Sequence, residues 1–235
     1  KIYQSLFYFD GRGKIRPELV DAVSRREKSL VISLQLKPGA RFADGSALNS
    51  QDVVATVALL KNPRFDYPYA ADLDFLEKIE AVDPLNLRIT LKKEFAPWEN
   101  YLTFKILNAA EIRLWHPEKF RQHIPLGSGP YRLTEINEPR GFELQKNPFW
   151  PRRQAFARIC YSVLGESRQA PLKLLTAEID AVEIQSDDAL TYSQLPKWQK
   201  HFQLLKYNKF GFTYLVFNSR NSRIDRNLQR IFYNR

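Results

Sequence analysis

Hydrophobic and polar residues alternate along this chain in two ways, with a period of two in some segments and with helical spacing in others. A period of two, bounded by turn residues, predicts strands over residues 2–9, 30–36, 79–82, 87–91, 131–136, 142–146, 158–163, 181–184, 202–207 and 212–218. Helical spacing predicts helices over residues 50–60, 97–103, 170–176, 187–195 and 224–233. Because both kinds of element alternate without an internal repeat, we expect an α/β protein of the mixed α+β kind.

The first of these helices carries the clearest local signals. Asn49 or Ser50 can cap its start, and Asp52 lies near its positive end. Valines and a leucine then recur at helical spacing until Asn62-Pro63, where proline ends the element. The two strands that follow are separated by residues 83–86 (DPLN), which predicts a hairpin.

Composition narrows the class of protein. The chain is 44% hydrophobic and 13% aromatic, which is enough to build a folded core and excludes intrinsic disorder. Its longest apolar run, residues 53–60 interrupted by Thr56, is far shorter than the ~18 residues of a spanning helix, so we expect no transmembrane segment. A single cysteine, Cys160, excludes an internal disulfide and a cysteine-based metal site. There is no methionine, and we therefore expect a processed chain or a fragment.

The residues that would support catalysis do not form a known pattern. The three histidines are far apart and match no metal-binding spacing. Residues 127–129 (GSG) are not a nucleophile elbow, because Leu126 and Pro130 occupy the positions that need glycine. Asp72 and Asp74 are close carboxylates, which we interpret as solvated charges at a helix start. We therefore predict no enzyme, no metal and no cofactor.

The formal net charge is +10, and most of the positive excess falls on residues 140–235. Arg223, Arg226 and Arg230 would share one face of the last predicted helix, a pattern that can contact phosphates. The same pattern is also typical of the solvent face of a terminal helix. We favour the solvent face and expect no nucleic acid partner.

Three stretches in order resemble the family 5 extracellular solute-binding proteins, the oligopeptide-binding receptors of ATP-binding-cassette (ABC) importers. Residues 34–54 (LQLKPGARFADGSALNSQDVV) resemble that family's strand, glycine turn, Asp-Gly turn and capped helix. Residues 125–131 (PLGSGPY), with a strand and then 147–150 (NPFW), form the second stretch. The third comprises 177–180 (AEID), 215–218 (LVFN) and a helix with Arg226. Together they cover essentially the whole chain.

The resemblance implies a non-catalytic receptor of two lobes that closes on a peptide or similar small solute and delivers it to an inner-membrane ABC permease. It implies a periplasmic or extracellular location, with a lipid anchor as one option. Members of the family are about twice as long as this chain, so we expect one class II periplasmic-binding-protein-like lobe. Residues 1–4 and 109–235 would form the core of lobe I and 5–108 a smaller inserted α/β domain, while the second, C-terminal lobe is missing. In peptide-binding members that missing lobe carries the acidic residue that pairs with the peptide's α-amino group.

Seven candidate ligand-binding residues follow. Tyr69, in the segment Pro68-Tyr69-Ala70, lies at the same interval after the Asp52 helix as a pocket tyrosine in peptide-binding members. Its phenol offers both apolar area and a hydrogen-bonding tip. The loop Gly127, Ser128 and Gly129 resembles a cleft-facing loop in which small residues let a ligand backbone approach exposed amides.

The other three candidates lie further along the chain. Glu166 is near an acidic pocket position of the family, although its spacing to Glu178 departs by one residue. Gln185 and Ser186 follow the predicted strand 181–184, and strand ends commonly line ligand clefts.

Two other functions stay open on the sequence. The arginines near the C-terminus leave open a ligand-sensing, solute-binding-like domain of a cytoplasmic transcription regulator. A degenerate lobe acting in protein assembly is the third option. A signal peptide before Lys1 would favour the receptor, whereas a helix-turn-helix there would favour the regulator.

Overall fold

The structure of the chain, a computed structural model, describes residues 2–114, 116, 124–137, 141–164, 170–184 and 186–205. The chain divides into two compact units, Lys1–Leu204 and Leu205–Arg235. Every helix and strand of the described residues belongs to the first unit.

An antiparallel sheet of four strands is the centre of residues 5–108. It contains β3 (Val20–Arg25), β4 (Val31–Leu36), β5 (Leu76–Ala81) and β6 (Asn86–Leu91) in the order β3-β4-β6-β5. Along β4 the burial alternates: Ile32, Leu34 and Leu36 are buried and the residues between them are exposed. This is the period expected of a sheet with one face on a core.

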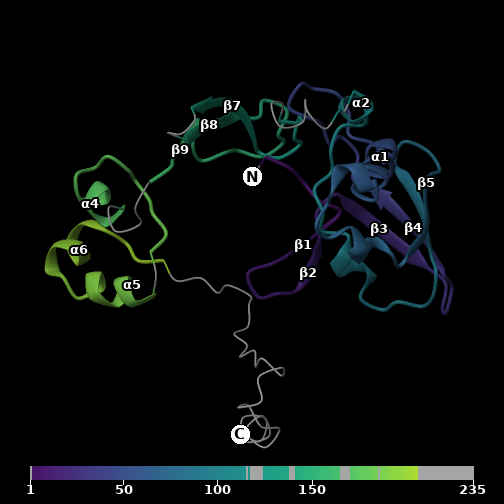
Figure 1. The fold of residues 1–235 in the computed structure, drawn as a ribbon, viewed down its shortest axis with the longest axis horizontal. Helices are drawn as coiled ribbons and strands as arrows, with labels where there is room; N and C mark the ends of the chain where they lie inside the picture. The colour runs from purple at the N-terminus through teal and green to yellow at the C-terminus, as the bar shows by residue number, and fades with distance from the viewer. Residues whose placement is uncertain are drawn as a thin grey trace, which may run out of the picture. The chain divides into compact units, whose positions relative to one another are not determined.

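Helix α1 (Ser50–Leu60) covers that face of the sheet (Figure 1). Its start is a capping box, in which the Asn49 side chain accepts from Gln51 N at 2.8 Å and the Asp52 carboxylate accepts from Asn49 N at 2.8 Å. Val53, Val57 and Leu60 of the helix join the buried residues of the sheet in one hydrophobic core. The capped helix and the hairpin of β5 and β6 confirm the predicted helix over residues 50–60 and the predicted hairpin with its turn at 83–86.

A hairpin and three short 3-10 helices surround this layer. The hairpin pairs β1 (Phe7–Phe9) with β2 (Ile15–Pro17). The 3-10 helices are η1 (Pro63–Phe65), η2 (Ala70–Leu73) and η3 (Trp98–Tyr101). Trp98 packs edge-to-face on Phe7 with ring centroids 5.7 Å apart, which ties η3 to the hairpin.

Residues 5–108 begin and end side by side. Ser5 forms an antiparallel bridge with Lys105, and Ile106 N donates to Gln4 O at 2.9 Å. Helix α2 (Ala109–Arg113) follows at once, and Ala109 N donates to the Asp52 carboxylate at 2.8 Å. These contacts lie where the sequence analysis placed the boundaries 4/5 and 108/109, a division that stays a prediction.

A second antiparallel sheet follows, in the order β7 (Tyr131–Asn137), β8 (Gly141–Lys146) and β9 (Arg158–Ser162). All strand pairs in the described residues are antiparallel, so the chain is mixed α+β within that part, in keeping with the predicted class. Three helices come after this sheet: α4 (Ala170–Leu175), α5 (Ser186–Ser193) and α6 (Pro196–His201). None of the described helices is long and apolar enough to cross a membrane.

Some sequence predictions differ from the structure. Residues 181–184 form no strand, because this short apolar run has no ladder partner in the described part of the chain. Residues 202–205 are not a strand either. Strand 212–218 and helix 224–233, with its arginine face, lie outside the described residues. Strands β2 and β3, helices α2 and α6 and the 3-10 helices η1 and η2 were not predicted.

Candidate ligand-binding site

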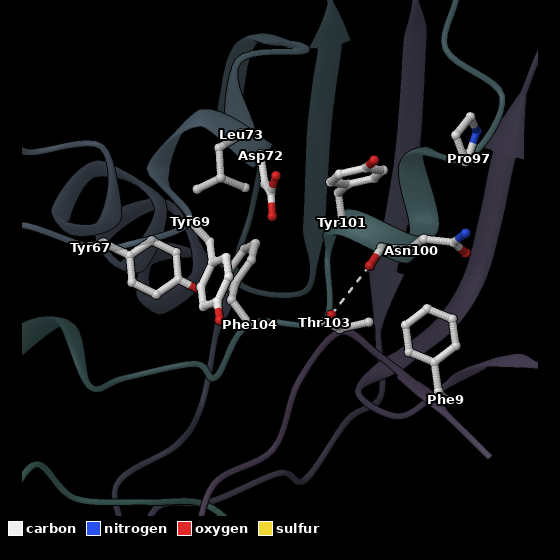
Figure 2. Close-up of a pocket in the computed structure, with 10 residues that line it drawn as sticks. All are labelled: Phe9, Tyr67, Tyr69, Asp72, Leu73, Pro97, Asn100, Tyr101, Thr103 and Phe104. Atoms are coloured by element: carbon white, nitrogen blue, oxygen red, sulfur yellow. Dashed lines mark hydrogen bonds between the residues drawn. The ribbon is translucent and has the colours of Figure 1, made fainter. Parts of the chain in front are cut away.

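A cavity of about 500 Å³ opens on residues 5–108 between η2 and η3 (Figure 2). One wall comes from the η2 region and consists of Tyr67, Tyr69, Asp72 and Leu73. The opposite wall comes from the η3 region and the end of β1, and consists of Phe9, Pro97, Asn100, Tyr101, Thr103 and Phe104. The cavity therefore contains Tyr69, the residue that the sequence analysis identified as the best single candidate for ligand contact.

The backbone around η2 holds the Tyr69 side chain outward. Asp66 adopts a left-handed conformation (φ 51°), which turns the chain after η1. Tyr69 then occupies the N-cap position of η2, and its carbonyl accepts from Asp72 N at 3.0 Å. The Tyr69 ring stays 62% exposed and meets the Tyr67 ring edge-to-face, with centroids 5.8 Å apart. The most exposed ring of the cavity thus has the Tyr67 ring as a neighbour and leaves much of its surface open to solvent.

Aromatic packing fixes the other wall. Tyr101 contacts Phe95 and Phe75, with centroid distances of 5.2 and 5.9 Å. Phe9 ends β1 and remains 48% exposed, while Phe104 is nearly buried. The cavity thus combines a buried apolar floor with rings that reach solvent, an arrangement suited to the apolar body of a ligand.

The Asp72 carboxylate is the one charged group among the ten lining residues. Figure 2 shows it directed into the space between the rings of Tyr69 and Tyr101. Burial raises the pKa of Tyr67, and the negative charges of Asp72 and of Tyr69 raise it further. The field of Asp72 therefore reaches the cavity wall. Asp72 is exposed at the start of η2, as the interpretation of a solvated helix-start charge expected.

The structure places the loop Gly127, Ser128 and Gly129 in a buried position. Gly129 N donates to Ile2 O at 2.7 Å, and Gly127 O accepts from Ala43 N at 3.0 Å. A Cβ on Gly127 would lie 2.0 Å from Ile2 O. All three residues are buried and the Gly129 amide is taken by Ile2 O, so small residues here let chain segments approach each other. Contact of this loop with a ligand stays a prediction.

Ser128 is 1% exposed, and its Oγ has no hydrogen-bond partner among the described residues. The structure says less about the other three candidate residues. Glu166 and Gln185 lie outside the described residues. Ser186 begins α5, but the structure does not describe its side chain. Residues 181–184 are not a strand, so the prediction that Gln185 and Ser186 follow a strand end is wrong.

Metal binding finds no support in the part of the chain that the structure describes, where no group of three His, Cys, Asp or Glu side chains converges. Cys160 is exposed and its Sγ lies 3.7 Å from the Glu143 carboxylate. The side chains that line the cavity offer a ligand rings, hydroxyl groups, the Asn100 amide and one carboxylate.

Comparison with known proteins gives the same family as the sequence resemblance. The model of the bacterial extracellular solute-binding proteins, family 5 Middle, matches residues 14–231. A relative named glutathione-binding protein GsiB, from Pectobacterium atrosepticum, is 30% identical over 151 residues, which are 63% of this chain and 29% of that protein. The chain thus spans well under half of this relative.

Solved structures match the fold. The oligopeptide-binding protein AppA from Bacillus subtilis, in complex with a nonapeptide, gives a TM-score of 0.75 at 19% identity. The match covers 83% of this chain and 40% of the AppA chain. NikZ from Campylobacter jejuni, in complex with Ni(L-His), gives a TM-score of 0.74 at 20% identity. The match covers 82% of this chain and 40% of the NikZ chain. The family is one of binding proteins rather than enzymes, as the sequence analysis predicted. Because the family model spans nearly the whole of it, this chain belongs to the bacterial extracellular solute-binding proteins of family 5.

Proposed function

We propose that this chain is part of the substrate-binding component of an ABC importer, which captures a peptide or a similar small solute without chemical change. The match of the family model over residues 14–231 carries the proposal. The proteins that this chain resembles bind glutathione (GsiB), a nonapeptide (AppA) and Ni(L-His) (NikZ), as their names state. A periplasmic or extracellular location and a permease partner belong to the same proposal.

The solute would be held between this lobe and a second one. Residues 5–108 are proposed as the inserted domain, and the remainder as the core of lobe I. The cavity beside Tyr69 is the surface that such a domain would offer to the solute. Extended peptides suit it, because backbone hydrogen bonds can hold the chain while an aromatic cavity accepts a side chain.

Calorimetry on the full-length protein with a di- to pentapeptide library tests this function. We expect at least one peptide to bind, and Tyr69→Ala to weaken that binding about fivefold, the ratio that ~1 kcal/mol of lost contact produces. Tyr8→Ala is the matched control, because Tyr8 is also an exposed tyrosine (43%) but does not line the cavity. Failure of every peptide, sugar, nickel complex and haem to bind would exclude a solute receptor.

A further inference from the structure

The charge of the cavity is opposite to that of the chain. The chain has 36 Lys and Arg against 26 Asp and Glu, yet Asp72 is the one charged residue among the ten that line the cavity. Among the described residues, no basic side chain forms an ion pair with Asp72. A carboxylate without a cationic partner, on a protein of net positive charge, makes this cavity a local negative site.

The rings around Asp72 add to the same preference. Tyr69, Tyr101 and Phe9 are 62%, 36% and 48% exposed, so their rings can be approached from the cavity. The face of an aromatic ring is negative and attracts a cation placed within ~6 Å of its centre. Because Asp72 points into the space between Tyr69 and Tyr101, one cation could meet the carboxylate and a ring face together (Figure 2).

We propose that this cavity binds a cationic group of the captured solute, an ammonium or guanidinium, between Asp72 and the exposed rings. The inference rests on the proposed function and specifies its ligand: a solute that carries a positive charge at the end of an apolar stem. The stem would lie on Leu73 and Phe104, which form the buried floor. For a peptide, the group is the side chain of a lysine or arginine.

Matched peptides test the inference on the full-length protein. The probes are alanine tetrapeptides with a free amino terminus that carry lysine or norleucine at each position in turn. Lysine and norleucine share their apolar stem and differ in the ammonium group. At one position we expect lysine to bind about tenfold tighter, a difference equal to ~1.4 kcal/mol.

The variants Asp72→Asn and Asp74→Asn locate the preference. Asp74 is also exposed and ends η2, but it does not line the cavity. We expect Asp72→Asn to abolish the preference for the cation and to leave the affinity for the norleucine peptide unchanged, while Asp74→Asn alters neither.

Two results overturn the inference. Equal affinity for the charged and uncharged peptides, or a preference that survives in Asp72→Asn, would do so while the proposed function stands. Absence of binding by every peptide would also overturn the inference, whereas the proposed function falls only if sugars, nickel complexes and haem fail to bind as well.

Discussion

Replacing Asp52 with alanine tests how α1 holds the chain at the end of residues 5–108. Asp52 is 3% exposed, and each of its carboxylate oxygens accepts one backbone N–H. One bond comes from Asn49 N at 2.8 Å, within the capping box, and the other from Ala109 N at 2.8 Å. The substitution therefore leaves two backbone donors without acceptors, one at the start of α1 and one at the start of α2.

The size of the effect follows from two opposing contributions. Hydrogen bonds to a charged group are worth ~1.5–3 kcal/mol each, or about 3–6 kcal/mol for the pair. Burial opposes them: it raises the pKa of Asp52, although the bonds from Ala109 and Asn49 lower it in part. Removing the buried charge returns some of that cost, so we expect a net loss of about 2–3 kcal/mol. A fold of 150–250 residues would lose about 4–12 °C in Tm for this change, and we expect the longer full-length protein to fall in the lower part of that range.

Thermal unfolding of the full-length protein, followed by circular dichroism, measures the loss. Hydrogen exchange at the Ala109 amide gives a local second measurement, because this amide loses its acceptor. Gln51→Ala is the control, since Gln51 lies exposed in the same helical turn, and it should change stability by less than ~0.5 kcal/mol. If Asp52→Ala and Gln51→Ala behave alike in both measurements, the role assigned to Asp52 is refuted.

Three further changes have expected outcomes. Gly127→Ala should destabilise the fold, because its Cβ would lie 2.0 Å from a backbone oxygen, whereas Gly11→Ala, with nothing within 4 Å, should be tolerated; equal melting temperatures would contradict this. Hydrogen bonds from the Asn86 side chain and from neighbouring amides lower the pKa of Asp83, so its contribution is present above the unfolded pKa and is lost as pH falls through the lower folded pKa. Asp83→Asn should therefore flatten the acid limb of a plot of unfolding free energy against pH, and an unchanged limb would contradict this role of Asp83. Thr56→Val should cost about 1–3 kcal/mol in urea unfolding, because it leaves a buried N–H without its Oγ1 acceptor, and a neutral result would count against that bond.

The elements that could be predicted from the sequence are those specified by residues close together in the chain. The capped helix and the hairpin after it are coded within a few residues, by Asn49 and by the turn at 83–86. The second bond of Asp52 could not be predicted, because Ala109 lies 57 positions away in the chain. Strand β3 was missed for a related reason: only Val20 of its six residues is buried, so it shows no apolar alternation.

The residues of the cavity could likewise be predicted only in part. Tyr69 could be found by its interval after a recognisable helix, but Phe9 and Tyr101 carry no motif of their own. They join the site because Trp98 packs on Phe7 and so brings η3 against the β1–β2 hairpin. Asp72 was interpreted as a solvated charge, and it is exposed; what the sequence could not show is the set of rings around it.

The bridge between Ser5 and Lys105 has a consequence for how such a protein can change. A segment whose first and last residues are already paired can vary in its interior without separating the chain segments that flank it. Natural variation can therefore remodel the aromatic cavity of residues 5–108 while residues 2–4 keep their contacts with 125–129. Chimaeras joined at these two positions are the most economical way to exchange one ligand surface for another.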